Sequence, residues 1–589
     1  MHQPYYREGL NGKYHLPWVY LHGIKDYTDM AAHLENHPNM RAVVNFSPIL
    51  LEQLDSYVKE LHNVLHQERS LSSTISDPIL ALLCGVEEIP ENIEARKQIV
   101  DDCKRCYAPR LIDPYPAFKR LIDCMDDAFE KVNSDSSDAV DTTHFPLSYL
   151  QDQYFIDLLM WYHLAWLGHS IKQTEVAKRL IEKGHGFTLD DRCQLVSLIS
   201  DSLAGIIPRY KKLADDGQIE LSLTPYAHPI IPLLNNFENM RCSLPHAPAP
   251  QTENYPDGWA RSHWHMEKGL EVFQHYFGRK PEGVWLSEGG ISPDALQLLN
   301  EYDIKWTATG EAVWQNTCNM TDCSQGHDNK RRSFFKPYQY NATSADNKEN
   351  KENERNEGNT SNSKIYFRDD GLSDLIGFEY SHWNAEDAAR NFEENLENIA
   401  TFLGSSDNNK SDHVVSIILD GENAWEYYLD NGYHFLDALY RKLSSNNHFK
   451  MTTFAEVSAK IDAIKINQFC SGSWVYGSFS TWIGQKDKNR AWEYLVEVKK
   501  TYDQKISDLS EEKQREAKLQ LAICEGSDWF WWFGEYNSSA SVNDFDRLFR
   551  VQLKLMYNML GITPPEALNH AISVGGGNAE NSGTMRRNT

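Results

Sequence analysis

Two carboxylates stand where the sequence pattern places the ends of strands. The apolar run at 283–286 leads into Ser-Glu-Gly-Gly, which contains Glu288, and the run at 414–419 leads into Asp420. The paired glycines leave Glu288 sterically open, as a nucleophile needs. Burial at a strand end raises the pKa of a carboxyl such as Asp420 toward the range of a general acid. Taken alone, such a glutamate is usually a surface residue, and Asp420 is equally well explained as the cap of a helix over 422–428.

A second group of polar residues combines histidine with proline and tyrosine. His2 lies in His-Gln-Pro-Tyr-Tyr and His228 in Thr-Pro-Tyr-Ala-His-Pro-Ile. On such stiff turns an imidazole can form hydrogen bonds with the hydroxyl groups of a sugar. Two alternatives stay open. A single histidine of this kind is more often structural, and His2, His228 and Asp420 together have the donor types of a metal site.

Aromatic side chains are frequent, with 16 Trp and 29 Tyr among 589 residues. The run Asp-Trp-Phe-Trp-Trp-Phe at 528–533 is too apolar for a solvated face and is usually part of a core. Asp528 at its head, together with Trp474 and Trp482, is also consistent with a rim on which sugar rings stack. The composition therefore suits a ligand with flat faces.

The elements that position these residues follow an α/β pattern. Short apolar runs alternate with helical patterns, which indicates mostly parallel strands. The runs lie at 43–46, 219–224, 283–286 and 414–419. The last three end in polar residues, and a β/α barrel gathers such strand ends around one active-site mouth. From about residue 460 onward, and most clearly over 489–520, the pattern becomes helical.

Charge and hydropathy exclude several classes of partner. The chain has 58 basic and 84 acidic residues, a net charge of −26, which opposes binding to nucleic acid or to an anionic membrane and suits a neutral substrate. No run approaches the roughly 20 apolar residues of a membrane-spanning helix, and the start lacks the pattern of a secretory signal. We therefore expect a soluble, cytoplasmic protein.

The ten cysteines predict no disulfide framework. They are sparse for the length, and only Cys103 and Cys106 form a C-x-x-C pair. The grouping of Cys84, Cys103, Cys106 and Cys124 lacks the second C-x-x-C or the histidine that a metal site needs at the right spacing. We expect these residues to be structural thiols.

Two segments are predicted to be disordered. Residues 342–364 are rich in Asn, Glu and Lys without a large apolar side chain, so they cannot offset the entropy lost on ordering. Residues 571–589 are predicted to form a flexible tail. The expected organisation is a catalytic domain over 1–455, an α-helical domain over 456–570 and this tail.

Six motifs in order resemble glycoside hydrolase family 57, the group of α-amylases, amylopullulanases, 4-α-glucanotransferases and glycogen-branching enzymes. Each motif alone is weak, but their order across nearly the whole chain makes the resemblance specific. The motifs are His-Gln-Pro-Tyr-Tyr (2–6), Gly-Gln-Ile-Glu-Leu with Thr-Pro-Tyr-Ala-His-Pro (217–229), Trp-Leu-Ser-Glu (285–288), Phe-Arg-Asp-Asp-Gly-Leu-Ser-Asp-Leu-Ile-Gly-Phe (367–378), Leu-Asp-Gly-Glu-Asn-Ala-Trp-Glu (419–426) and Glu-Gly-Ser-Asp-Trp-Phe-Trp-Trp (525–532).

The resemblance implies an incomplete seven-stranded (β/α) barrel followed by an α-helical C-terminal domain. It also implies Glu288 as nucleophile and Asp420 as general acid/base, with no metal or organic cofactor. The residues expected around the bound glucan are His2, His228, Trp285, Arg368, Trp474 and Asp528. Members usually carry an apolar strand before His-Gln-Pro, whereas this chain begins at Met1. A truncated start, or a missing strand beside His2, is therefore expected.

The function implied by the resemblance is a retaining glycoside hydrolase. It would cleave α-1,4-glucosidic bonds of starch or glycogen through a covalent glycosyl-enzyme intermediate, with α-1,6 activity as an option. A 4-α-glucanotransferase or glucan branching enzyme is the closest alternative, because transfer shares this intermediate. A metal-dependent glycan deacetylase with His2, His228 and Asp420 as ligands, and a non-catalytic glucan-binding protein, are further alternatives.

Overall fold

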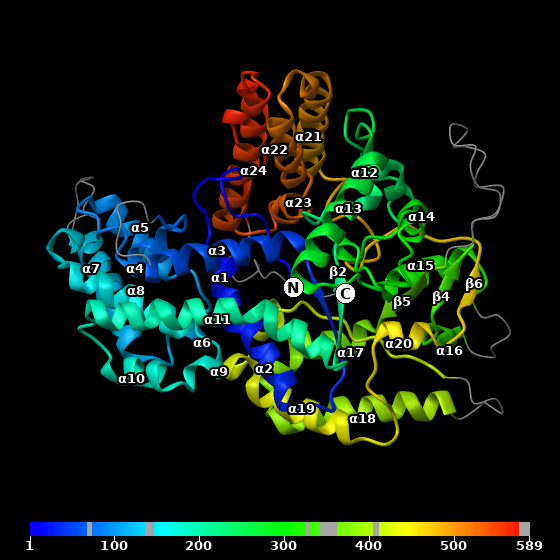
Figure 1. Cartoon of the computed structure of the whole chain (residues 1–589), viewed down its shortest axis with the longest axis horizontal. Helices are drawn as coiled ribbons and strands as arrows, with labels where there is room; N and C mark the ends of the chain where they lie inside the picture. Colours follow the sequence, from blue (N-terminus) through cyan, green and yellow to red (C-terminus); the bar gives the residue numbers. More distant parts are fainter. Residues whose placement is uncertain (67–73, 136–145, 324–329, 342–361, 405–411, 577–589) are drawn as a thin grey trace.

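The computed structural model describes residues 1–66, 74–135, 146–323, 330–341, 362–404 and 412–576. Short strands lie near the middle of the molecule and toward one side, with helices around them (Figure 1). Helices from residues 78–183 form one end, and the last long helices stand together on one edge (Figure 1). The chain is therefore a mixed helix and sheet protein, with the sheets in its interior part.

The strands form two small sheets. They are β1 (Ala42–Phe46), β2 (Ile219–Leu223), β3 (Trp306–Gly310), β4 (Tyr338–Tyr340), β5 (Lys364–Arg368) and β6 (Ile464–Ile466). β1 and β2 are parallel, with Ala42 opposite Ile219, and β3 and β5 are parallel, with Trp306 opposite Lys364. β4 pairs antiparallel with β5 and parallel with β6.

Single parallel bridges connect the two sheets. β2 bridges to Val284, Gly283 bridges to β3, and Arg368 of β5 bridges to Ser416. Residues 283–286, expected as a strand, pair with their neighbours only in this way. Parallel pairing thus runs from β1 through β2, the 283–284 segment, β3 and β5 to Ser416. Because these segments run in one direction, the residues that follow them lie at one edge.

The first two expected strands are confirmed as β1 and β2, but the run at 414–419 forms no strand. Its backbone partners change along the run: Val414 N donates to Phe335 O, whereas Ile418 O accepts from the side chain of Arg368. A β-ladder needs the same partner strand along its whole length. The β-branched residues of this run favour a strand, but without such a partner they do not form one.

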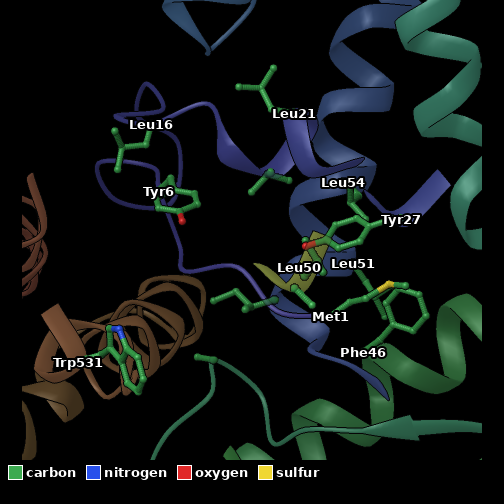
Figure 2. Close-up of a cluster of buried hydrophobic side chains, with 14 of the residues drawn as sticks. Met1, Tyr6, Leu16, Leu21, Tyr27, Phe46, Leu50, Leu51, Leu54 and Trp531 are labelled. Atoms are coloured by element: carbon green, nitrogen blue, oxygen red, sulfur yellow. The ribbon is translucent and has the colours of Figure 1, made fainter. Parts of the chain in front are cut away.

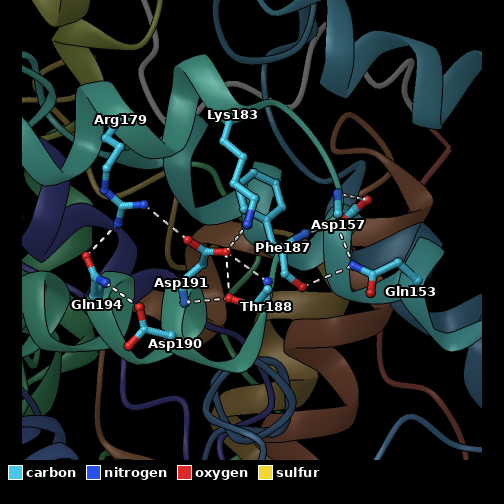
Figure 3. Close-up of polar contacts among 10 residues, drawn as sticks. Gln153, Asp157, Arg179, Lys183, Phe187, Thr188, Asp190, Asp191 and Gln194 are labelled. Atoms are coloured by element: carbon cyan, nitrogen blue, oxygen red, sulfur yellow. Dashed lines mark hydrogen bonds and ion pairs between the residues drawn. The ribbon is translucent and has the colours of Figure 1, made fainter.

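The chain up to β2 is mostly helical. Its helices are α1 (Trp18–His22), α2 (Thr28–Asn36), α3 (Pro48–His66), α4 (Pro78–Cys84), α5 (Ile93–Cys103), α6 (Ala108–Leu111), α7 (Pro116–Asp135), α8 (Asp152–Trp166), α9 (His169–Lys172), α10 (Glu175–Lys183) and α11 (Leu189–Asp215). α11 begins with a capping box, in which Thr188 N donates to Asp191 Oδ2 at 2.8 Å and Asp191 N donates to Thr188 Oγ1 at 3.3 Å (Figure 3). These bonds satisfy two donors at the helix start.

The helices that follow β2 are α12 (Ile231–Asn235), α13 (Gly258–Phe277), α14 (Pro293–Glu301), α15 (Glu311–Met320), α16 (Lys330–Phe334), α17 (Asp370–Asp374), α18 (Ala385–Gly404), α19 (Tyr433–Ser445) and α20 (Phe454–Ser458). α18 and α19 pack on each other along one side of the molecule (Figure 1). α17 directly follows β5, so that the polar residues after this strand stay close to its end.

The C-terminal helices are α21 (Lys486–Lys505), α22 (Glu511–Cys524), α23 (Asp528–Trp532) and α24 (Ser539–Met559). α24 contacts each of the other three. The helical pattern expected from residue 460 begins later, because β6 and irregular chain come first. The expected helix over 489–520 is interrupted between α21 and α22, where Ser510 caps α22.

The start of the chain is packed into the core beside β1. Met1 is 9% exposed and belongs to the apolar cluster around α3 and β1 that includes Phe46 and Leu50 (Figure 2). Each fully buried large aliphatic or aromatic side chain contributes about 1.5–3 kcal/mol to folding. Met1 N donates to Asn45 O at 2.7 Å, and Ser47 N donates to Met1 O at 3.0 Å. These contacts place His2 at the end of β1.

The expectation that the cysteines form no disulfides is wrong. Cys242 is bonded to Cys470, and Cys318 is bonded to Cys323. The first pair is separated by 228 residues, so no local spacing announces it. The group of Cys84, Cys103, Cys106 and Cys124 consists of free thiols.

Most of the predicted insertion at 342–364 lies outside the described residues. At its end, Ser363 is fully buried and Lys364 is the first residue of β5. The predicted tail, 571–589, is described up to residue 576. There the backbone N–H groups of Ile572 and Ser573 donate to Asp546 of α24. Among the described residues, no helix is long and apolar enough to cross a membrane.

Candidate active site

Glu288 lies on a strained turn. It is the middle residue of the 3-10 turn η5 (Ser287–Gly289), with a φ of 58°, a left-handed conformation that costs a non-glycine residue about 1–2 kcal/mol. At Gly289, also left-handed, a Cβ would lie 3.0 Å from the ring of Trp285. Trp474 N donates to Glu288 O at 3.2 Å. The main chain thus holds Glu288 in one orientation, with its side chain 14% exposed.

Two tryptophans flank this carboxylate. Trp474 Nε1 donates to Glu288 Oε2 at 3.2 Å, and the ring of Trp474 meets the ring of Trp285 edge-on at 5.3 Å. Both rings are half-buried, so each keeps surface on which a sugar can stack. The expectation that Trp482 belongs to the same rim is wrong, because Trp482 is fully buried and lies 6.0 Å from Trp531 in the core.

His2 and His228 stack face to face beside Glu288. Their ring centroids are 3.6 Å apart, at an interplanar angle of 10°. His228 Nδ1 forms a 2.8 Å hydrogen bond with Ser527 Oγ, and His2 Nε2 forms one of 2.8 Å with Asp528 Oδ1. Burial, followed by the charge of His2, lowers the pKa of His228 well below its ordinary value. His228 is therefore neutral near pH 7 and acts as a hydrogen-bonding group.

A metal site with His2, His228 and Asp420 is not assembled. Within the described part of the chain, the ligand atoms that lie within 4.8 Å of one another belong to His2, His228 and Asp528 instead. The two rings are nearly parallel, so one ion cannot lie in both ring planes. The geometry of these three residues therefore favours hydrogen bonding over metal coordination.

Asp420 is half-buried, and its pKa is raised above its ordinary value. Burial, followed by the negative charge of Glu422, raises the pKa of Asp420 to about 6. A hydrogen bond from Asn423 Nδ2, at 3.4 Å, and the positive charges of the Met1 amino group and of Arg368 act in the opposite direction. A carboxyl with this pKa can donate a proton at pH 5–6 and accept it back.

Arg368 is 6% exposed at the end of β5, and most of its hydrogen-bonding capacity is used within the protein. Its Nε donates to Ile418 O at 2.8 Å, Nη1 to Asp370 Oδ1 at 2.7 Å and Nη2 to Asp374 Oδ1 at 2.7 Å. The fork of carboxylates fixes the guanidinium plane. Arg368 therefore positions the segment before Asp420.

One chain of contacts links Glu288 to the segment before Asp420. Trp474 binds Glu288 Oε2, and the guanidinium carbon of Arg368 lies 5.5 Å from the centre of the Trp474 ring. Arg368 in turn binds Ile418 O, two residues before Asp420. Buried cation–π contacts of this kind contribute about 2 kcal/mol and fix the tryptophan face.

A second chain of contacts links Glu288 to the segment after Asp420. His228 Nδ1 lies 4.0 Å from Glu288 Oε1, and His2 stacks on His228. The backbone N–H of His2 donates to Glu422 Oε1 at 3.0 Å. Contacts among Glu288, Glu422 and the six residues predicted to surround the substrate thus reach the segments on both sides of Asp420.

The sequence profile of glycosyl hydrolase family 57 matches residues 1–468. The chain belongs to glycosyl hydrolase family 57. It is accordingly a glycoside hydrolase of the retaining class that acts on α-glucans, as the resemblance predicted. No curated protein sequence matches the chain.

Solved structures of family 57 enzymes share the fold. An α-amylase, AmyC, from Thermotoga maritima is 12% identical, with a TM-score of 0.53 over 96% of this chain and 94% of that one. A branching enzyme from Pyrococcus horikoshii is 13% identical, with a TM-score of 0.52 over 96% and 94%. A branching enzyme from Thermococcus kodakaraensis, in complex with glucose, is 13% identical, with a TM-score of 0.51 over 95% and 88%.

Two residues of this family 57 site were not predicted from the sequence. Ser527 binds the ring of His228 and precedes Asp528. Glu422 binds the backbone of His2 and faces Asp420. Both lie inside quoted motifs, at 525–532 and 419–426, but only the fold shows which neighbour each contacts.

Proposed function

We propose that this family 57 enzyme hydrolyses α-1,4-glucosidic bonds of starch- or glycogen-type glucans through a covalent intermediate, with Glu288 as nucleophile and Asp420 as general acid/base. The observation that carries the proposal is the set of contacts that connects Glu288 to the segments on both sides of Asp420. Glu288 lies on a strained turn between two tryptophans, and the pKa of Asp420 is raised to about 6. This division of roles is the one that a retaining mechanism requires.

In the first step, a carboxylate oxygen of Glu288 attacks the anomeric carbon while Asp420 donates its proton to the glycosidic oxygen. The bond between these two substrate atoms breaks, and the rest of the glucan leaves as an alcohol. In the second step, Asp420 takes a proton from water, whose oxygen attacks the anomeric carbon and releases Glu288 as a carboxylate. Two inversions give net retention.

We assign the substrate-facing roles by chemistry. Trp285 and Trp474 would stack on sugar faces. The neutral ring of His228, and the His2 and Asp528 pair, would form hydrogen bonds with hydroxyl groups of the sugar at the cleavage site. Arg368 would act mainly through Trp474 and Asp420, because its guanidinium already binds two carboxylates and a carbonyl.

We further propose that the run of parallel pairings from β1 to Ser416 is the incomplete seven-stranded barrel, followed by the helical C-terminal domain. The division of the chain into a catalytic domain (1–455), a helical domain (456–570) and a tail (571–589) stays a prediction. A cytoplasmic location also stays a prediction, and the two disulfides count against it because cytosolic thiols are kept reduced.

The experiment is incubation with maltooligosaccharides of defined length, followed by chromatography of the products. Each hydrolysis event gives two shorter chains and one new reducing end. Products longer than the substrate, formed without new reducing ends, would mean that a sugar hydroxyl is the acceptor and would replace hydrolysis by glucan transfer. Pullulan, which contains both bond types, separates α-1,4 from α-1,6 cleavage.

A further inference from the structure

Glu422 is a buried carboxylate that lies two residues from the proposed general acid. It is 3% exposed. Its Oε1 accepts three hydrogen bonds, from His2 N at 3.0 Å, Gln3 Nε2 at 3.3 Å and Tyr27 OH at 3.1 Å. These donors carry no net charge, so they orient the carboxylate and offset its negative charge only in part.

The other oxygen of Glu422 has no partner. Oε2 is buried and forms no hydrogen bond with any described residue. Leaving a buried acceptor unpaired costs about 1–3 kcal/mol, and an arrangement that is costly for stability is often kept for function. A glutamine would give the same three donors an acceptor oxygen without the negative charge, so the hydrogen bonds alone do not explain why this residue is charged.

The charges around Asp420 show what Glu422 can do. Asp420 faces Glu422, the amino group of Met1 and Arg368, and its polar but uncharged neighbour is Asn423. Two positive groups favour the ionised form of Asp420, and burial together with Glu422 favours the protonated form. Without Glu422, the balance moves toward the ionised form, which cannot protonate a leaving group.

We propose that Glu422 is a positioning residue of the active site, which presents a buried negative charge to Asp420 and whose Oε1 fixes the backbone of His2. The inference rests on the proposed function, because it assigns Asp420 as the acid. Glu422 itself does not touch the reacting atoms. Its contacts with Gln3 and Tyr27 hold it in place, and Tyr6 OH binds Gln3 Oε1 at 2.9 Å behind them.

The test is the pH dependence of kcat/KM for Glu422→Gln, with soluble starch as substrate. The amide keeps the size and an acceptor oxygen but loses the charge. We expect the alkaline limb of this profile, where kcat/KM falls as pH rises, to move to lower pH by roughly half a unit or more. The reason is that Asp420 then loses its proton at a lower pH. Glu426→Gln is the matched control. Glu426 lies in the same motif, faces Lys25, His22 and Asp26, and should leave the limb in place.

Two outcomes overturn the inference. The first is a folded Glu422→Gln enzyme whose alkaline limb is unchanged. If this variant does not fold, Tyr27→Phe decides, because it removes one donor, leaves more of the negative charge of Glu422 facing Asp420 and should move the limb to higher pH. The second outcome is a Tyr27→Phe enzyme whose alkaline limb lies at the same pH as that of the parent. A wild-type chain without activity on glucan would instead overturn the proposed function.

Discussion

Asp191 and Asp420 are the same side chain in opposite environments. Asp191, at the start of α11, accepts hydrogen bonds from Thr188 N at 2.8 Å, from Arg179 Nη1 at 3.2 Å and from Lys183 (Figure 3). Burial acts to raise its pKa, but these donors bring the pKa of Asp191 well below its ordinary value. At Asp420, burial and Glu422 prevail over Arg368 and raise the pKa to about 6.

The difference between the two pKa values distinguishes a carboxylate that stabilises the fold from one that can take part in acid catalysis. A carboxylate surrounded by donors is held in its ionised form and contributes folding free energy across the neutral range. A carboxyl that is desolvated beside a second carboxylate costs stability but can exchange a proton under working conditions. Asp191 is thus a cap that binds α10 to α11, and Asp420 is suited to acid catalysis.

The largest expected effect comes from replacing Glu288, the proposed nucleophile. Glu288→Gln should lower kcat on soluble starch by about 10⁴-fold or more, because an amide cannot attack the anomeric carbon. Circular dichroism should show an unchanged fold. Glu282→Gln, at an exposed position six residues earlier, is the control and should keep full activity. A Glu288→Gln variant as active as the parent would contradict the assignment of the nucleophile.

Replacing the acid should have the next largest effect. Asp420→Asn is expected to lower kcat/KM on glucan by about 10²–10⁴-fold, because the amide cannot protonate the glycosidic oxygen. With α-maltosyl fluoride, whose leaving group needs no proton, the loss should be much smaller. Rates measured side by side on both substrates check this. An equal loss on both would mean that Asp420 is structural.

The corresponding change at the other aspartate should affect stability only. Asp191→Asn is expected to lower the free energy of unfolding by about 1–3 kcal/mol at pH 7, because it weakens the cap and the contacts with two cations. The folded pKa is depressed, so the contribution is present above the ordinary value of about 3.9 and is lost as pH falls below it. Urea unfolding at pH 7 and pH 3 should show that the difference in free energy of unfolding between parent and variant is smaller at pH 3. A difference independent of pH would refute the stabilising role of ionised Asp191.

The smallest effect concerns the pH profile. Asp420 must be protonated to act, so kcat/KM should fall as pH rises through about 6. Asp191→Asn should leave this limb where it is, because its titration range lies far lower and its charge is remote from the site. If Asp191→Asn moved the alkaline limb, or if the limb of the wild type lay well above pH 7, the contrast between Asp191 and Asp420 would be wrong.

Strand positions and motifs were predictable where the signal is local. The apolar runs that form β1 and β2 follow from residue types and spacing. The run at 414–419 looked like a strand as well, yet its hydrogen-bond partners come from different segments, which no local pattern encodes. Burial of Trp482 likewise depends on packing of distant helices.

Pairings across long stretches of sequence were not predictable. The disulfide between Cys242 and Cys470 joins residues 228 apart, and their spacing carries no signal. Glu422 binds the backbone of His2 from a position 420 residues away. Single-sequence reasoning identifies the chemistry of a residue, but which residues share one site is set by the fold.

The most direct measurement is covalent trapping of the enzyme with 5-fluoro-α-glucosyl fluoride, followed by peptide mass spectrometry. The fluorine slows release of the intermediate, so the sugar stays on the attacking carboxylate. We predict one added glycosyl group on the peptide that contains Glu288, at the Glu288 side chain. A label on Asp420, or full turnover without any covalent label, would contradict the division of roles between these two residues.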